Sequence, residues 1–555
     1  MLEGCTPWPE EFVKRYVEAG YWEGHTIGEI IDDSASKFGP REAVVGDNGS
    51  RYTYNELKQL SDRLALHLLD IGLKPKDRVL VQLTNVPEFA ILYFALQKAG
   101  LIPVMALPQH RLHEVRFFAE LSEARAYFIP SRVKNFDYGE LAKQVQAKVP
   151  SVEFIIAHGE GEPAGSISLN KLLADPIEEW VSLKRLEEVR PDPKEVAIFL
   201  LSGGTTGLPK LIPRTHNDYI YNSKASFSVI PYERDSVFLL AIPIEHNYPI
   251  VTGLQPTLMV GGKAVLTEST EVDHLLSLIE KERVTILPTV PSLSIRIINH
   301  PSFSKHDMSS VKVIMSGAQK LQPELKPRIE DAFGAGVQEG FGMAEGLLCF
   351  SRLDDPDDVR SLTTGRPISP GDEIRVVDEE GREVSYGEPG ELITRGPYTL
   401  RGYYKAPEHN KSAFNSEGFY LSGDIVRLGP GGGLVVEGRR KDMINRGGEH
   451  ISAEEIENLI ITHQAVHNVA VIGMPDPDMG ERICAYIIPK PGRSLTFQEL
   501  SSFLMSKEIA KFKLPERLEL VSEFPLTNIG KVSKKDLREV IAKKLQEEKA
   551  PLRRE

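Results

Sequence analysis

The 555-residue sequence has few cysteines, no long hydrophobic run and no excess of positive charge. Its three cysteines, Cys5, Cys349 and Cys484, include no CxxC pair, so neither a disulfide framework nor a thiolate zinc site is expected. The 66 Lys and Arg residues stand against 79 Asp and Glu, and this formal charge of −13 offers no global attraction to nucleic acid or anionic lipid. No run of 18 apolar residues occurs, and MLEGCTPWPEEF does not have the pattern of a signal peptide. We therefore expect a cytoplasmic protein with no nucleic-acid and no membrane partner.

What is present, between about residues 78 and 342, is an alternation of short apolar runs with segments of helical period. The consecutive segments RVLVQL, EFAILYFALQKAG and LIPVMAL are examples, and such alternation is typical of βα units with a mostly parallel sheet. After Ile374 the apolar runs become shorter and richer in glycine, which favours smaller antiparallel β-structure. The sequence thus predicts an α/β fold: a large N-terminal domain of βα-type sheets with a small β subdomain.

The pattern changes again after residue 439. In SAEEIENLIITH, Ser452 and Glu455 have the spacing of a capping box ahead of an amphipathic helix. Two strand-like runs, NVAVIG and ICAYIIP, a helical segment at residues 497–505, the run RLELV and a charged final helix follow. We expect residues 441–555 to form a small α+β C-terminal domain, joined by a hinge to a large domain of residues 1–440.

A glycine-rich loop follows the apolar run VAIFLL. This loop, SGGTTGLPK at residues 202–210, contains three glycines that let backbone N–H groups approach an anion, and its hydroxyls add further donors. Such a composition suits a triphosphate. The loop is not a Walker A motif, because Pro209 stands where the second glycine belongs and Leu211 follows the lysine.

The loop, ending in Thr-Gly-x-Pro-Lys, resembles the signature of the adenylate-forming superfamily, which includes acyl-CoA ligases, luciferases and peptide-synthetase adenylation domains. Five further segments resemble that superfamily's motifs in the same order: EGFGMAEG at 339–346, GELITRG at 390–396, YLSGD at 420–424, EGRRKDMINRGGEHISAEEIE at 437–457 and PLTNIGKVSKK at 525–535. The resemblance implies the two-domain architecture described above, with ATP and Mg²⁺ as cofactors.

The resemblance also implies roles for individual residues. Lys531 would stabilise the negative charge that develops when a carboxylate attacks the α-phosphate, and Glu345 would contact Mg²⁺ as a hard oxygen ligand. Asp424 would accept hydrogen bonds from the ribose hydroxyls. The full set of implied ATP-binding residues is Ser202, Gly203, Gly204, Thr205, Thr206, Gly207, Lys210, Gly317, Ala318, Gly340, Asp424, Arg439 and Lys531.

Lys441 falls where the superfamily places its hinge residue, and Gly447 and Gly448 resemble a glycine flap that follows the hinge. A small domain that rotates about one residue could present Lys531 for adenylation and the flap for a second half-reaction. One site would then serve two reactions.

The segment AIPIEHNYPI carries His246, Asn247 and Tyr248, and together with FGMAEGLL it resembles the stand-alone aryl-acid AMP ligases of siderophore assembly. There the matched asparagine binds near the carboxylate and ortho-hydroxyl, a place that suits an amide with both donor and acceptor. His246 is counted with Lys531 and Glu345 as a candidate catalytic residue. The implied acid-binding residues are His246, Asn247, Tyr248, Thr252, Gly317 and Leu348.

Two of these positions point to different acids. Thr252 matches a position that is serine in the dihydroxybenzoate enzymes, whereas Leu348 matches a leucine of the salicylate enzymes. A larger Leu348 removes about one methylene of space near a 3-hydroxyl, which is worth only ~1 to 3 kcal/mol of discrimination. The sequence leans towards salicylate and leaves 2,3-dihydroxybenzoate open.

The chain ends 24 residues after Lys531, so we expect the acceptor thiol to lie elsewhere. The resemblance implies a phosphopantetheinylated aryl carrier protein on a separate chain. Two alternatives stay open: an aryl- or acyl-CoA ligase, which would share every nucleotide motif, and a non-catalytic nucleotide-binding protein on the same scaffold.

Overall fold

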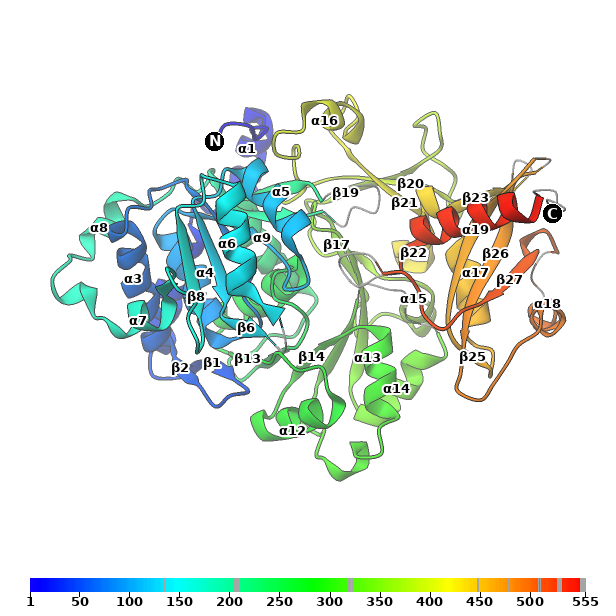
Figure 1. The fold of residues 1–555 in the computed structure, drawn as a ribbon, viewed down its shortest axis with the longest axis horizontal. Helices are drawn as coiled ribbons and strands as arrows, with labels where there is room; N and C mark the ends of the chain where they lie inside the picture. The colour runs from blue at the N-terminus through cyan, green and yellow to red at the C-terminus, as the bar shows by residue number, and fades with distance from the viewer. Residues whose placement is uncertain are drawn as a thin grey trace, which may run out of the picture.

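The computed structural model describes residues 1–133, 136–202, 209–317, 321, 323–446, 449–477, 479–507, 509, 511–526 and 532–549. Two large, mostly parallel sheets form its N-terminal body (Figure 1). The first has nine strands; neighbours from β16 to β1 are parallel, and the strands at both ends are antiparallel. Its spatial order is β18 (Arg366–Pro367), β17 (Leu348–Phe350), β16 (Gly336–Gly342), β15 (Val313–Ser316), β14 (Ile286–Thr289), β12 (Val237–Leu240), β13 (Lys263–Leu266), β1 (Glu42–Gly46) and β2 (Arg51–Thr53).

The second sheet has seven strands and is parallel except at one edge, where β11 is antiparallel to β10. Its order is β11 (Leu211–Thr215), β10 (Val196–Leu201), β4 (Ile102–Met105), β3 (Arg78–Val81), β5 (Ala126–Pro130), β8 (Phe154–His158) and β9 (Ile167–Ser168). The short strands β6 (Arg132–Val133) and β7 (Phe136–Asp137) form a separate hairpin. The predicted α/β alternation is therefore confirmed, although the nine-stranded sheet already begins at residue 42.

Helices cover these sheets because most of them carry an apolar stripe. Helix α4 has no such stripe: it is mostly apolar, all its residues are buried, and it contacts β1 of one sheet and β4 of the other. The helices of the N-terminal body are α1 (Glu10–Glu18), α2 (Ile27–Phe38), α3 (Tyr54–Asp70), α4 (Pro87–Lys98), α5 (Leu112–Ser122), α6 (Tyr138–Lys148), α7 (Leu169–Ala174), α8 (Lys184–Glu188), α9 (His216–Ala225), α10 (Asn247–Pro249), α11 (Gln255–Met259), α12 (Val272–Glu282), α13 (Pro291–Ile298), α14 (Leu325–Phe333) and α15 (Asp357–Leu362).

A four-stranded antiparallel sheet follows, as the glycine-rich runs predict. It consists of β19 (Glu373–Val377), β20 (Gly390–Arg395), β21 (Tyr420–Leu428) and β22 (Leu434–Arg439), with α16 (Pro407–Ala413) between β20 and β21. The 3-10 turn η6 (Arg440–Asp442) leads from β22 into the last part of the chain.

The C-terminal part forms its own five-stranded sheet, which lies at one end of the long axis with α3, α7 and α8 at the other (Figure 1). Its elements are β23 (Met443–Arg446), β24 (Glu449–Ser452), α17 (Ala453–Ile460), β25 (Val466–Asp476), β26 (Gly480–Pro489), α18 (Phe497–Ser506), β27 (Arg517–Leu520) and α19 (Lys534–Lys549). The apolar residues of its two clusters all come from residues 444–545. A separate core of this kind is expected of a small α+β unit, while the boundary at residues 440 and 441 stays a prediction.

The predicted capping box is only half present. The Ser452 side chain accepts a hydrogen bond from the backbone N–H of Glu455 at 3.1 Å, as a cap should. The carboxylate of Glu455, however, pairs with Lys513 at 2.7 Å, because the small domain brings that distant cation over the first turn of α17. None of the helices in the described ranges combines the length and apolarity that crossing a membrane requires.

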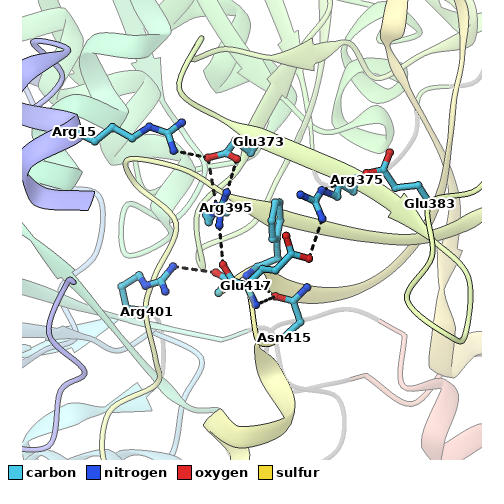
Figure 2. Close-up of polar contacts among 10 residues, drawn as sticks. Arg15, Glu373, Arg375, Glu383, Arg395, Arg401, Asn415 and Glu417 are labelled. Atoms are coloured by element: carbon cyan, nitrogen blue, oxygen red, sulfur yellow. Dashed lines mark hydrogen bonds and ion pairs between the residues drawn. The ribbon is translucent and has the colours of Figure 1, made fainter. Parts of the chain in front are cut away.

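The N-terminal helix α1 is fastened to the four-stranded sheet by arginines and glutamates (Figure 2). Glu373 on β19 pairs with Arg15 of α1 at 3.0 Å and with Arg395 of β20 at 2.6 Å. The Arg395 guanidinium lies 5.4 Å from the ring centroid of Phe12 and 4.4 Å from that of Phe419. This arrangement joins α1 to β19 and β20 through charge and aromatic contacts together.

The same contacts continue to the turn before β21. Arg375 pairs with Glu417 at 3.0 Å and with Glu383 at 3.3 Å, while Arg401 donates to the carbonyl of Gly418 at 2.9 Å. Burial alone would raise the pKa of Glu373, but its bond to Arg395 and the nearby charges lower that pKa below its usual range. We call this set the arginine network: Arg15, Glu373, Arg375, Glu383, Arg395, Arg401, Glu417 and the Gly418 carbonyl.

Candidate active site

The candidate residues gather at the carboxyl ends of parallel strands. Ser202 follows β10, the segment 241–248 follows β12, and Gly317 follows β15. Gly340 and Glu345 lie within and just after β16. Because the carboxyl ends of parallel strands open at one edge of a sheet, this is where α/β folds place their ligands.

Tyr248 and two glycines meet on the acid-binding side. A Cβ atom on Gly317 would lie 3.8 Å from Tyr248 Cζ and 3.8 Å from the Gly340 carbonyl oxygen, so the three residues are near van der Waals contact. Burial raises the pKa of the Tyr248 hydroxyl above its usual range, so this hydroxyl keeps its proton at neutral pH. The structure thus brings Tyr248, Gly317 and Gly340 together, as the sequence predicts for a shared acid and adenine site.

Thr252 and Leu348 are both buried beside this group. Thr252 lies in the π-helix η3 (Ile250–Leu254), an irregularity that is frequent at functional sites, and its hydroxyl donates to the Tyr248 carbonyl at 2.7 Å. Leu348 on β17 is paired with Gly342, and a Cβ on that glycine would lie within 2.3 Å of the leucine side chain. The hydroxyl of Thr252 therefore has no second proton to donate to a ligand. The Leu348 side chain fills the space that a side chain on Gly342 would occupy.

Several polar atoms of this region are buried without a partner among the described residues. They are Asn247 Oδ1, Ser316 Oγ and both carboxylate oxygens of Glu245. Burial raises the pKa of the Glu245 carboxyl well above its usual range. Since more than nine in ten buried polar groups in folded proteins are hydrogen-bonded, each of these oxygens is a candidate for a bond to a ligand or to ordered water.

His246 is half-buried and sits immediately before α10, with extended backbone angles of φ −73° and ψ 152°. Its neighbour Asn247 begins that helix, so the two side chains leave the backbone where β12 has ended and α10 begins. His246 is thus the residue before Asn247, at the start of α10.

On the nucleotide side, the ends of the glycine-rich loop are held together. Ser202 N–H donates to the Lys210 carbonyl at 3.0 Å, and Lys210 N–H donates to Ser202 Oγ at 2.9 Å. Lys210 Nζ lies 5.6 Å from the ring centroid of Tyr403. The loop residues Gly203, Gly204, Thr205, Thr206 and Gly207 lie outside the described residues.

Glu345 is buried and accepts a hydrogen bond on Oε1 from the Tyr403 hydroxyl at 2.8 Å. Burial and the adjacent Glu345 carboxylate raise the pKa of Tyr403 far above its usual range, so Tyr403 is the donor. Within the described ranges no group of three or more His, Cys, Asp and Glu side chains could hold a metal on its own. One carboxylate supplemented by phosphate oxygens is the donor set that Mg²⁺ takes, so Glu345 fits such an ion only together with a nucleotide.

Asp424 and Arg439 are paired across β21 and β22. Arg439 Nε lies 2.6 Å from Asp424 Oδ1, the Asp424 side chain is 4% exposed, and that of Arg439 is 49% exposed. The motif residues predicted to contact ribose are therefore neighbours, with a buried acid and a cation that reaches solvent.

Other predicted residues are not tested in this way. Lys531, Ala318, Gly447 and Gly448 lie outside the described residues, and Lys441 is placed in the turn η6. Their catalytic, binding and hinge roles stay predictions.

Sequence reasoning missed Glu245, Ser316 and Tyr403. Glu245 and Ser316 each adjoin a predicted site residue, so their positions were within reach of the motifs. Nothing local in the sequence pairs Tyr403 with Glu345, 58 residues earlier; the run RGYYK after the GELITRG motif was the only hint.

Residues 31–404 match the AMP-binding enzyme family, and residues 455–531 match the AMP-binding enzyme C-terminal domain. The chain is 46% identical to a 2,3-dihydroxybenzoate-AMP ligase of Bacillus subtilis (strain 168), covering 98% of this chain and 99% of the relative. It is 46% identical to a salicylyl-CoA synthase / salicylate adenylyltransferase of a Streptomyces species, covering 97% and 98%.

A third relative is a salicyl-AMP ligase / salicyl-S-ArCP synthetase of Mycobacterium tuberculosis, 38% identical over 96% of this chain and 94% of the relative. Among solved structures, the apo structure of Mycobacterium smegmatis MbtA superposes with a TM-score of 0.73 at 38% identity, covering 97% of this chain and 98% of that one.

Proposed function

The chain belongs to the AMP-binding enzyme family, and we propose that it is an aryl-acid AMP ligase of siderophore assembly. In the first step, the carboxylate of a 2-hydroxybenzoate attacks the α-phosphate of ATP, forming aryl-AMP and releasing pyrophosphate. In the second, a thiol attacks the acyl carbon and AMP leaves. The large domain of residues 1–440 binds both substrates, and the domain of residues 441–555 rotates about Lys441 between the steps.

The observation that carries this proposal is the buried Oδ1 of Asn247, which has no partner among the described residues and belongs to the residue before Tyr248, itself in near contact with Gly317. An ortho-hydroxyl of an aryl acid supplies the donor that this oxygen lacks, while the amide nitrogen can donate to the acid's carboxylate. Tyr248 offers a flat aromatic surface, which suits an aromatic ring. A site that leaves a polar atom unpaired without its ligand discriminates strongly against acids that have no hydroxyl there.

The nucleotide side supports ATP as the second substrate. Asp424, which pairs with Arg439, would contact the ribose, Arg439 would contact the ribose or a phosphate, and Ser202 and Lys210 close the loop proposed to hold the phosphates. Glu345 would hold Mg²⁺ together with the phosphate oxygens, and the ion would supply positive charge against the charge that builds on the α-phosphate. Lys531 would add a second positive charge from the C-terminal domain.

We favour salicylate over 2,3-dihydroxybenzoate. The hydroxyl proton of Thr252 is donated to the Tyr248 carbonyl, so this residue can only accept from a 3-hydroxyl, and Leu348 fills the space beside Gly342. Relatives at the same identity are named for either acid, so similarity supports the class of hydroxybenzoates without choosing between them.

The proposed acceptor is the phosphopantetheine thiol of an aryl carrier protein on another chain. The name of one relative includes salicyl-S-ArCP synthetase, whereas another is named as a CoA synthase, so coenzyme A is the rival acceptor. Competition between a carrier domain and CoA for the aryl adenylate decides between the two.

Acid-dependent exchange of pyrophosphate into ATP, measured without an acceptor, tests the first step. We expect exchange with salicylate and 2,3-dihydroxybenzoate, slower exchange with benzoate, and none with aliphatic or amino acids. Lys531→Ala serves as the control and should lose exchange by orders of magnitude. Exchange confined to acids without an ortho-hydroxyl would refute the proposed substrate class.

A further inference from the structure

Two tyrosine hydroxyls connect the predicted ribose motif to the predicted magnesium ligand. Tyr420, the first residue of the YLSGD motif, has its hydroxyl 2.9 Å from that of Tyr403, which in turn lies 2.8 Å from Glu345 Oε1. Glu345 is 8% exposed, and both tyrosines are buried. The three side chains thus form one buried hydrogen-bonded chain.

The direction of this chain follows from counting protons. A phenol has a single proton to donate, and Tyr403 gives it to the carboxylate of Glu345. The Tyr403 oxygen must therefore accept from Tyr420. The bond from Tyr403 engages Oε1 and leaves Oε2 of Glu345 for a cation.

The backbone around Tyr403 is fixed on both sides. Its N–H donates to Asn410 Oδ1 at 2.8 Å, and its carbonyl accepts from Asn410 Nδ2 at 2.9 Å. The preceding residue, Gly402, packs closely against Thr6 and Asn410, because a Cβ there would lie 2.3 Å from Thr6 Oγ1 and 3.0 Å from Asn410 Nδ2. One residue earlier, Arg401 is held by the arginine network (Figure 2).

The segment that carries Tyr403 also holds the backbone of Glu345. Leu400 N–H donates to the Glu345 carbonyl at 2.7 Å, so residues 400–403 contact both the main chain and the side chain of this acid. On another side, the Tyr403 ring lies 5.6 Å from Lys210 Nζ, at the end of the phosphate loop. Tyr403 therefore contacts Glu345, the predicted magnesium ligand, and also lies near Lys210, at the end of the predicted phosphate loop.

We propose that Tyr403 is a positioning residue of this enzyme. Its hydroxyl aims the Glu345 carboxylate at a magnesium ion on the ATP phosphates, and its ring sets the place of the Lys210 ammonium. The inference rests on the proposed function in assigning ATP and Mg²⁺ to the site. Groups that orient a metal ligand through a hydrogen bond typically contribute about 10- to 100-fold to metal affinity or activity.

The test is calorimetric titration of ATP into the full-length protein, once with Mg²⁺ and once with EDTA. Tyr403→Phe keeps the ring and removes the hydroxyl, so we expect binding of MgATP to weaken by about 10-fold or more and binding of metal-free ATP to stay within about twofold of wild type. Tyr54→Phe is the matched control, since it removes a buried hydroxyl bonded to the Gly262 carbonyl, far along the nine-stranded sheet. It should leave both titrations unchanged.

Two further variants guard against a general loss of structure. Tyr420→Phe removes only the donor to Tyr403 and should weaken MgATP binding less than Tyr403→Phe. In Glu345→Gln, adding Tyr403→Phe should cause no further loss, because the tyrosine acts through that carboxylate. Equal losses with and without metal, or additive losses in the double variant, would overturn the proposal.

These titrations contain no aryl acid, so they are independent of the substrate proposal. If no hydroxybenzoate supports pyrophosphate exchange but the metal-dependent difference is found, the substrate class fails and the role of Tyr403 stands. If exchange is found but Tyr403→Phe binds MgATP like wild type, the role of Tyr403 fails alone.

Discussion

The arginine network and the three residues Glu245, Asn247 and Ser316, here called the unpartnered group, both consist of polar side chains, yet they are built in opposite ways. In the network each charge has an opposite charge, a carbonyl or an aromatic face against it, as between Glu373, Arg15 and Arg395. The unpartnered group instead has buried oxygens without a partner among the described residues.

The contrast separates scaffold from site. A buried polar group that is paired inside the protein contributes to folding and has little remaining hydrogen-bonding capacity for a ligand. A buried polar group without a partner costs about 1 to 3 kcal/mol of folding free energy until a ligand or water pairs with it. Substitutions in the arginine network should therefore change stability, and substitutions in the unpartnered group should change substrate affinity. Substitutions in the two regions can separate these effects.

The largest effect should come from Asn247→Ala, in the unpartnered group, on the KM of the aryl acid. Because its Oδ1 has no partner among the described residues, the change should not lower the melting temperature, and it should raise the KM of the aryl acid by about 100-fold. The KM of ATP should hardly change. Pyrophosphate exchange measures the two KM values, and thermal unfolding measures the melting temperature. A large loss of stability with normal acid affinity would show that Asn247 is structural and does not bind the acid.

The converse change is Glu373→Ala in the arginine network. It leaves two guanidinium groups without their carboxylate, and since Glu373 is 30% exposed we expect a loss of ~1 to 2 kcal/mol in unfolding free energy. The KM of the acid should stay the same. Glu383→Ala, on the exposed edge of the same network with its side chain 67% accessible, is the control and should be nearly neutral. An acid KM that rises in Glu373→Ala would break the distinction between the two regions.

The two regions should also respond to pH in opposite directions. The pKa of Glu245 is raised by burial, so its contribution to stability is complete below the unfolded pKa, near 4.5, and is lost as the pH rises. The pKa of Glu373 is lowered, so its contribution is present above that value and is lost as the pH falls.

Glu245→Gln removes the first of these titrations. Between pH 5 and the folded pKa of Glu245, the unfolding free energy of the variant should rise relative to that of wild type by up to about 1.4 kcal/mol per pH unit. Chemical unfolding at pH 5, 7 and 9 measures the difference. A constant difference across that range would mean that Glu245 does not titrate on unfolding.

The smallest effect concerns which hydroxybenzoate fits. Leu348→Val opens about one methylene of space where Gly342 already lacks a side chain, so the ratio of kcat/KM for 2,3-dihydroxybenzoate over salicylate should rise about fivefold to tenfold, or ~1 kcal/mol. Thr252→Val, which removes the hydroxyl bonded to the Tyr248 carbonyl, is the companion test. If only the threonine variant shifts the ratio, Thr252 and not Leu348 sets the choice of acid.

Much of the fold could be predicted because its signals are local. The βα alternation, the antiparallel strands after Ile374 and the separate C-terminal unit each appear as a change of pattern within a short window. In the site, Asn247 follows β12 and Glu345 follows β16, whereas Asp424 lies within β21, and the roles of all three stay predictions.

What could not be predicted depends on distant contacts. Glu455 has the spacing of a capping box but is taken by Lys513, and Tyr403 becomes important only because folding brings it to Glu345. Likewise, Glu245 reads as an ordinary loop acid until its burial is seen. Sequence spacing predicts contacts within one helix or strand. The partners of Glu455 and Tyr403 and the burial of Glu245 instead depend on elements that are distant in the sequence.

The cysteines offer a practical consequence for spectroscopy. Burial raises the pKa of Cys5 and of Cys484 to about 12, and Cys349 is also buried with its pKa raised, so at neutral pH all three thiols are poor nucleophiles. Cysteines introduced at Trp180 and Leu526, whose side chains are 63% and 60% exposed on the N-terminal body and the C-terminal unit, should react first with maleimide dyes. Energy transfer between such a dye pair would follow the proposed domain rotation in single molecules during turnover, without removing a native residue from the core.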